Sequence, residues 1–98
     1  ANMMITAAAK LLSDEFGVVV GPNKLMNALR THGYLMVGRS SLEKNQPYQK
    51  YINKGWFVWK EVDISESVGY GKHVGQTMIT PLGLSKLAHT IVSWFRAD

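Results

Sequence analysis

The sequence contains no cysteine and no long apolar run. Without thiols the chain can form no disulfide, thiolate nucleophile or iron–sulfur cluster, and it lacks the main ligand of structural zinc sites. A reducing cytoplasm is therefore the expected compartment. The apolar stretches, such as Val18–Val20, fall far short of the about 20 residues that cross a bilayer, so we expect no transmembrane segment, no secretory signal and no membrane partner.

The sequence also has few of the patterns that carry catalysis. His32, His73 and His89 lie on three separate predicted elements, and no pair has the i, i+4 spacing of a helical metal site. No serine stands in a Gly-x-Ser-x-Gly motif, and no histidine–acid pair is indicated for nucleophilic catalysis. We therefore expect a protein that is not an enzyme and that uses neither a metal nor a cofactor.

The length and charge of the chain limit its size and its partners. The 98 residues are enough for one domain. Residues 1–2 precede Met3 and are interpreted as a scar of recombinant expression, so the single domain is predicted over residues 3–98. Eleven Lys and Arg against seven Asp and Glu give a net charge of +4 at pH 7, which favours an anionic partner.

Helical periodicity predicts a first helix over Thr6–Phe16 and a last helix that begins after Thr80. Apolar residues recur every three or four positions in the first helix, and Thr6 is placed as its N-cap. Thr80 is followed by Pro81, a residue that suits the first helical turn. The apolar stripe of the last helix includes Leu87 and Ile91, and this stripe is expected to face the core.

A second helix is predicted over Pro22–His32, followed by Gly33 as a stop signal. Its inward stripe is expected to contain Leu25, Leu29 and His32. The opposite face carries side chains that can hydrogen-bond or hold a positive charge: Asn23, Lys24, Asn27, Arg30 and Thr31. No acidic residue occurs over Pro22–Met36, which favours contact of this face with an anion.

The central part of the chain is predicted to contain short elements and a hairpin. Tyr34–Val37 is predicted as a strand and Tyr48–Lys54 as one or two helical turns. Trp56–Ile64 and Gln76–Thr80 are predicted strands, joined by a glycine-containing loop into a hairpin over residues 56–80. The element order predicts an α+β winged helix-turn-helix, in which helices are combined with a two-stranded β-hairpin wing. The predicted core includes Leu12, Leu25, Leu29, Phe57, Leu87 and Ile91.

Motifs along nearly the whole chain resemble the C-terminal domain of phage antirepressor proteins, the KilA-C or ANT domain. The most specific is Pro47-Tyr48-Gln49-Lys50-Tyr51-Ile52 running to Gly55-Trp56-Phe57, which is similar to the family's Pro-x-Gln followed by an aliphatic residue, Gly and an aromatic pair. The other matching stretches are Ala7-Ala8-Ala9-Lys10-Leu11-Leu12, Gly21-Pro22-Asn23-Lys24-Leu25, Leu29-Arg30-Thr31-His32-Gly33-Tyr34-Leu35 and Thr80-Pro81-Leu82-Gly83. The resemblance implies a winged-helix fold and the transcription-regulating role of a bacteriophage or prophage protein that acts in the bacterial cytoplasm, with DNA binding commonly inferred for the domain.

The leading functional hypothesis is binding of double-stranded DNA, with helix 22–32 as the recognition helix and hairpin 56–80 as the wing. Asparagine amides can pair with adenine edges, and Lys or Arg can bind guanine or phosphate. At the tip of the hairpin, Lys72 and His73 lie between glycines and could touch phosphate or a minor groove. The candidate DNA-binding residues are Asn23, Lys24, Asn27, Arg30, Thr31, Arg39, Lys72 and His73.

The alternative is a protein-interaction module that sequesters a repressor or a host factor without binding DNA. Trp94 and Phe95, near the end of the chain, exceed what a small core needs. An exposed aromatic end would suit contact with a repressor, a host protein or a second copy of the chain in a homodimer. The two hypotheses differ in the surface they require, because DNA needs converging positive potential and a protein partner needs an apolar patch.

Overall fold

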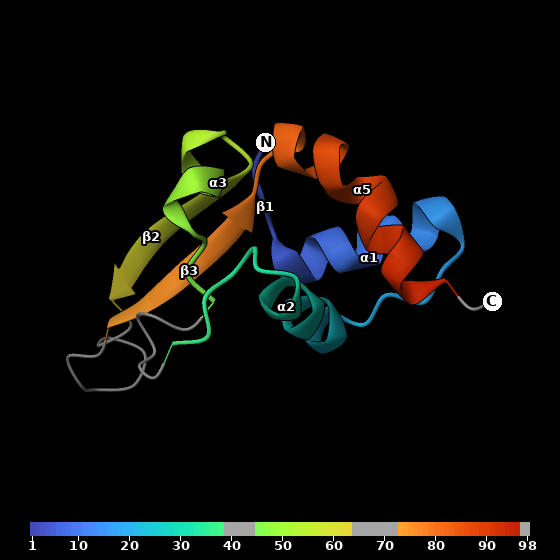
Figure 1. Ribbon diagram of the computed structural model, residues 1–98, viewed down its shortest axis with the longest axis horizontal. Helices are drawn as coiled ribbons and strands as arrows, with labels where there is room; N and C mark the ends of the chain where they lie inside the picture. Colours follow the sequence, from blue (N-terminus) through green and yellow to red (C-terminus); the bar gives the residue numbers. More distant parts are fainter. Residues whose placement is uncertain (39–44, 64–72, 97–98) are drawn as a thin grey trace.

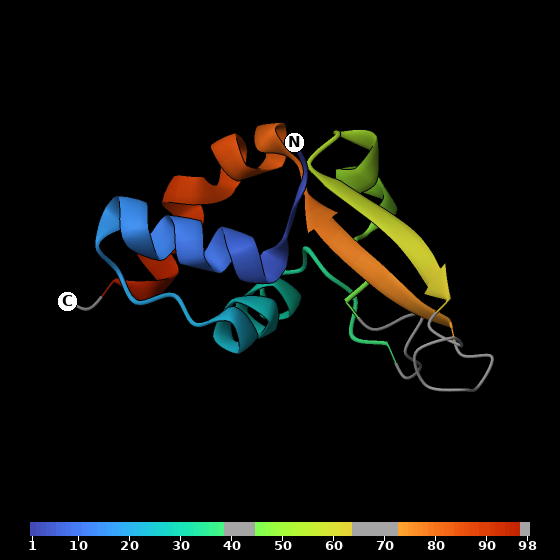
Figure 2. The ribbon, with the colours of Figure 1, turned by 180° about the vertical axis from the view of Figure 1, so that it is seen from behind.

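The computed structural model describes residues 1–38, 45–63 and 73–96, which divide into a helical part and a small sheet (Figure 1). Within these ranges the elements are β1 (Met3–Met4), α1 (Ile5–Phe16), α2 (Pro22–Thr31), α3 (Gln49–Asn53), β2 (Phe57–Asp63), β3 (His73–Ile79) and α5 (Pro81–Phe95). Helices α1, α2 and α5 lie together at one end of the molecule, and α3 lies beside the strands (Figure 1, Figure 2). The α+β class predicted from the sequence is confirmed.

Helix α1 packs through a stripe of small and branched side chains, and its predicted start is wrong by one residue. The helix begins at Ile5, which is itself buried, and Met4 occupies the N-cap position without a side-chain hydrogen bond. Thr6 is exposed in the first turn and caps nothing. Strand β1 ends at Met4, and the next residue, Ile5, is buried in the core as the first residue of the helix. At the other end Gly17 adopts a left-handed conformation, with φ 64°, and its N–H bonds to the Ser13 carbonyl at 3.0 Å.

Helix α2 is held against α1 by its apolar face and by the connection between the two helices. Leu25 and Leu29 are buried, as predicted. The Ser13 hydroxyl accepts a hydrogen bond from the Val20 N–H at 2.9 Å, which fixes the connection just before Pro22. The helix ends at Thr31, and His32 is its C-cap.

His32 was expected on the inward stripe of α2, and this expectation is wrong. The side chain is exposed, because the helix has already ended and the chain turns away at Gly33. The imidazole stacks instead on the indole of Trp94 in α5, with ring centroids 3.9 Å apart and an interplanar angle of 2°.

The predicted hairpin is confirmed, but its second strand begins at His73 and not at the predicted Gln76, and a third strand joins the sheet. Strands β2 and β3 pair antiparallel, from Phe57 opposite Ile79 to Asp63 opposite His73. Strand β1 pairs with the other edge of β3, which gives the strand order β1-β3-β2. The loop between β2 and β3, residues 64–72, lies outside the described residues.

The predicted strand at Tyr34–Val37 is wrong. Leu35 forms only an isolated bridge with Pro47, and Met36 exchanges two backbone hydrogen bonds with the segment that leads into α3: Met36 N–H to Gln46 O at 2.8 Å and Asn45 N–H to Met36 O at 3.0 Å. Too few residues pair for a regular strand to form.

The two remaining helices form where the sequence predicts them. Helix α3 occupies Gln49–Asn53 within the predicted Tyr48–Lys54. Helix α5 begins at Pro81, and the Thr80 hydroxyl caps it by accepting a hydrogen bond from the Gly83 N–H at 2.9 Å. The Thr80 backbone N–H also bonds to the Trp56 carbonyl at 3.0 Å, so the base of the hairpin fixes the first turn of α5.

A single hydrophobic core joins the helices to the sheet. All six side chains predicted for it are confirmed, with exposures of 2% or less: Leu12, Leu25, Leu29, Phe57, Leu87 and Ile91. Other members of the cluster include Ile5, Leu35 and Ile79. The face of α2 opposite this core is thereby turned outward and held in a fixed orientation.

Candidate nucleic-acid interface

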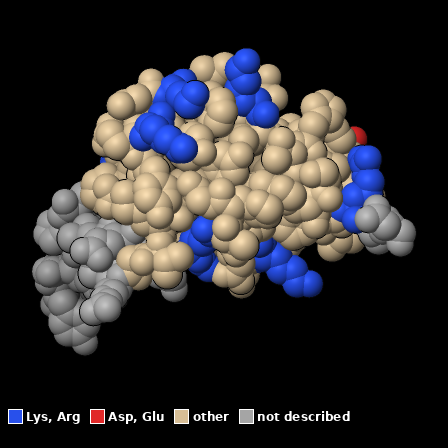
Figure 3. All heavy atoms as spheres, in the orientation of Figure 1, with Lys and Arg blue, Asp and Glu red and all other residues tan. Residues whose placement is uncertain are grey.

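The polar face of α2 presents exposed hydrogen-bonding side chains and an exposed cation. Asn23, Lys24, Asn27 and Thr31 are exposed, at spacings that place them on one side of the helix, and Arg30 is half-buried. The first turn of α2 carries no acid, and its last turn carries Arg30. Figure 3 shows Lys and Arg side chains over α2 at the lower edge of the molecule, with acidic side chains of the described residues visible only at the right-hand edge.

Arg30 does not extend freely into solvent. One terminal nitrogen of its guanidinium donates to Asn27 Oδ1, one turn earlier on α2, and the other donates to Asn45 Oδ1. The structure therefore brings together two of the predicted site residues, Asn27 and Arg30, and adds Asn45, which sequence reasoning missed. Asn45 adopts φ 65°, a left-handed conformation that asparagine tolerates better than most residues. The sequence signal at this position was the residue type, because asparagine favours such a turn conformation.

The other three predicted site residues are Arg39, Lys72 and His73. Arg39 and Lys72 lie outside the described residues. His73 is the first residue of β3, and its backbone is paired with Asp63 at the open end of the hairpin. The α2 residues are thus the part of the predicted site whose geometry is described.

A second basic surface lies over α3. The Lys50 ammonium is 4.9 Å from the ring centroid of Tyr51, and the Lys54 ammonium is 5.3 Å from that of Trp56. These distances permit cation–π attraction, which keeps the cations at the surface beside the rings. Lys and Arg side chains are visible over α3 at the upper left of Figure 3.

These two rings belong to a row of aromatic side chains that links α2, α5 and α3, here called the aromatic row. It consists of His32, Trp94, Tyr34, Tyr51 and Trp56. Successive ring centroids lie 3.9, 6.1, 4.8 and 5.5 Å apart. Burial raises the pKa of the Tyr34 hydroxyl, the neighbouring Tyr51 raises it further, and Lys50 opposes the rise. The rings largely cover one another, so the row is first of all packing between elements.

Trp94 and Phe95, the residues of the alternative hypothesis, are both half-buried. Trp94 is covered by His32 and Tyr34. Phe95 borders two hollows that also contain Val19, a residue of the α1–α2 connection with 89% of its surface exposed. One of these hollows is lined by Asn23 and Lys24 as well, so the aromatic end of α5 lies next to the start of the α2 polar face.

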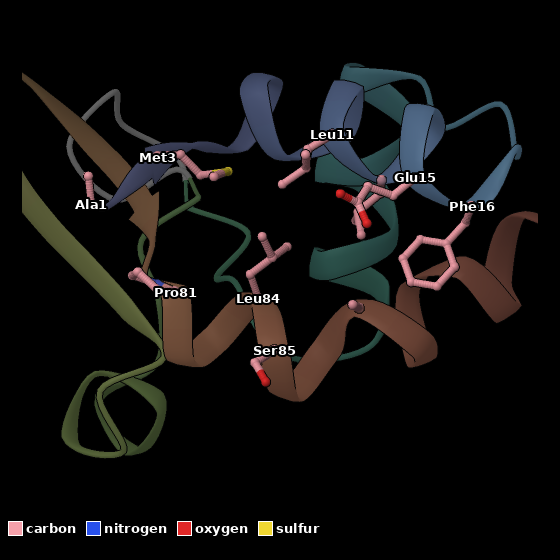
Figure 4. A pocket seen from close by; sticks show the side chains of 10 residues that line it. Ala1, Met3, Leu11, Glu15, Phe16, Pro81, Leu84 and Ser85 are labelled. Carbon is pink, nitrogen blue, oxygen red and sulfur yellow. The ribbon is translucent and has the colours of Figure 1, made fainter.

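An apolar groove of about 490 Å³ separates α1 from α5 (Figure 4). Leu11 from α1 and Leu84 from α5 point toward one another across it, and Glu15 lies near Phe16 at one end. None of the predicted site residues that the structure describes lines this groove.

Other site classes find no support in the part of the chain that is described. Within residues 1–38, 45–63 and 73–96, no group of three or more His, Cys, Asp or Glu could hold a metal ion. No helix in these ranges is both long enough and apolar enough to span a bilayer.

The fold and the site together define a small α+β domain with a helix pair, an antiparallel hairpin and an acid-free helix face. The chain belongs to the phage antirepressor protein KilAC domain family, whose model matches residues 1–93. It is similar to Antirepressor protein 1 of Escherichia phage P1, with 38% identity over 79 residues. That alignment covers 79% of this chain and 22% of the phage P1 protein, so the chain spans less than a quarter of that relative's length. No solved structure gives a significant match.

Proposed function

We propose that this domain binds double-stranded DNA as a winged helix-turn-helix, with α2 in the major groove and the β2–β3 hairpin as the wing. The polar face of α2 is the observation that carries the proposal. Its four exposed side chains are all neutral hydrogen-bonding groups or cations, and the apolar face behind them is fixed in the core. A helix of this length, about 15 Å, fits the major groove, where side chains can reach base edges.

The arrangement of the elements supports the same proposal. The helix pair α1 and α2 precedes the β2–β3 hairpin, with the short helix α3 between them, and a helix pair with a hairpin wing is what a winged helix-turn-helix requires. In both ribbon views, α2 and the open end of the hairpin lie toward the same lower edge of the molecule (Figure 1, Figure 2). In this proposal a duplex runs along this edge and contacts both α2 and the end of the hairpin.

In this proposal the domain is a non-enzymatic regulatory module of a phage or prophage protein that acts on DNA in the cytoplasm of the bacterial host. It would need no metal and no nucleotide. Its membership of the antirepressor family supports a regulatory role.

A matched pair of lysine substitutions tests the proposal. Lys24 lies on the α2 polar face and Lys86 on the outer face of α5, and both are exposed. In an electrophoretic shift titration, Lys24→Ala is expected to weaken duplex binding about tenfold, the effect of losing one charge-assisted hydrogen bond worth about 1.5 kcal/mol. Lys86→Ala should bind as the unmodified protein does. Equal binding by all three proteins would contradict the assignment of α2 as the recognition helix.

The second candidate function is capture of a repressor or host protein without DNA. The observation that favours it is the largely exposed Val19 beside Phe95. In this case Val19→Asp, and not Lys24→Ala, would abolish binding to a purified repressor of the same phage in isothermal titration calorimetry. Val19 is a cleaner probe than Trp94, because the indole is packed against His32 and Tyr34 and its loss would also disturb the fold.

A further inference from the structure

The cluster around Arg30 joins α2 to the sheet. Asn45 reaches Arg30 through its side chain, and its backbone carbonyl accepts a hydrogen bond from the Thr77 hydroxyl at 2.6 Å. Thr77 lies on β3 and is buried. Backbone bonding with Met36 fixes Asn45 from the other side. Arg30 is therefore held at its far end by a residue whose own position is set by the core of the domain.

The chemistry of the guanidinium determines how the two amides are oriented. Arginine donates hydrogen bonds and accepts none, so each asparagine must present its carbonyl oxygen to Arg30. The amino group of each asparagine then points away from the guanidinium. For Asn27, which is exposed on the polar face of α2, this orientation turns the amino group away from Arg30 and holds the carbonyl oxygen beside the guanidinium.

We infer that Arg30 is a positioning residue that makes Asn27 a hydrogen-bond donor toward DNA, an inference that rests on the proposed function. In the major groove, guanine offers two acceptors, N7 and O6, whereas adenine offers one acceptor and one donor. An asparagine pairs with adenine through its oxygen and its amino group together. When Arg30 holds the oxygen of Asn27, the amino group is the end left free to contact a base, and it can only donate. The arrangement therefore favours a guanine, which offers this donor two acceptors, at the base pair that Asn27 meets.

This assignment differs from the expectation that Arg30 contacts guanine or phosphate itself. The two roles give different results when Arg30 is removed. If Arg30 bound a phosphate, its loss would weaken binding to all sequences equally and reduce the salt dependence by about one phosphate contact. If Arg30 only orients Asn27, its loss changes sequence preference and leaves the salt dependence as it was.

The test begins with a preferred duplex selected from a random library by the unmodified domain. Affinities for this duplex and for its single-pair variants are then measured with Arg30→Met, Asn27→Ala and the double variant. Methionine keeps the unbranched apolar stem of Arg30 and removes the donors, and thermal unfolding verifies that each variant folds. Each single variant is expected to lose about tenfold in its preference for one guanine-containing pair, at an unchanged salt slope. The double variant should lose no more than either single variant, since Arg30 acts through Asn27.

A second substitution keeps the inference testable if Arg30→Met is unstable. Asn27→Asp retains an oxygen acceptor for Arg30 and presents no amino group, so it should lose the guanine preference while the Arg30 contact remains. Additive losses in the double variant, or a salt slope flattened by Arg30→Met, would show that Arg30 contacts DNA itself and would overturn the inference but leave the proposed function intact. A domain that binds no duplex at all would overturn both.

Discussion

Gly83→Ala is expected to lower the free energy of unfolding by about 3 kcal/mol or more, at the upper end of the cost of overpacking a core. A Cβ at this position would overlap the carbonyl oxygen of Trp56 and lie 2.8 Å from its Cα. These are backbone atoms at the base of the hairpin, and they are fixed by the Thr80 N–H that bonds to the same carbonyl. Helix α5 would therefore have to move away from the sheet, and the midpoint of thermal unfolding should fall by more than about 10 °C.

Gly21→Ala provides the control for that substitution. Gly21 is the N-cap of α2 and has φ −73°, which alanine adopts without strain. A Cβ there would meet only the Lys24 side chain, at 3.8 Å. We expect a change within about 1 kcal/mol. A Gly83→Ala protein that unfolds at the same temperature as the Gly21→Ala protein would show that α5 does not approach the hairpin this closely.

Leu29→Ala is expected to cost about 2–5 kcal/mol, because it leaves a cavity beneath α2 that close-packed neighbours fill only in part. Leu29 is buried in the core cluster and lies on the face of α2 opposite the proposed DNA contacts. For a domain of this size the loss is a large share of the total stability. The measurement is the midpoint of chemical denaturation.

Leu82→Ala removes the same side chain at a site that is 48% exposed, and it should change that midpoint little. An unchanged midpoint for Leu29→Ala would mean that α2 does not pack by this face. In that case the polar face could not be the surface offered to a partner.

The helices and the core could be predicted from the sequence because their signals are local. Leu25 and Leu29 are one turn apart, and Pro22 and Thr80 mark helix starts through their own chemistry. The hairpin could also be predicted, from two β-rich stretches around a glycine-containing loop.

Features that depend on contacts distant in sequence could not be predicted. Strand β1 has only two residues, too few for a periodic pattern, and it exists because Met3 and Met4 pair with the end of β3. Tyr34–Val37 has the composition of a strand, but only Leu35 finds a bridge partner. Composition favours a strand, and the available partner decides whether one forms.

The sequence predicted only the part of the candidate site that depends on local signals. The exposed face of α2 follows from its helical periodicity, so Asn23, Lys24 and Asn27 could be placed outward from the sequence. The bond between Arg30 and Asn45 spans 15 positions and depends on the path of the intervening chain. A free cation was therefore expected where the structure has a bonded one.

The salt dependence of duplex binding tests the central claim most directly. If the domain contacts about four to six phosphates, a plot of log K against log salt concentration should have a slope of roughly −4 to −5, and a chelator should not change it. Fluorescence anisotropy of a labelled duplex can measure this slope for the unmodified domain and for Lys24→Ala, whose plot should be flatter by about one. Binding that is independent of salt, or no binding by the unmodified domain at low salt, would contradict the account.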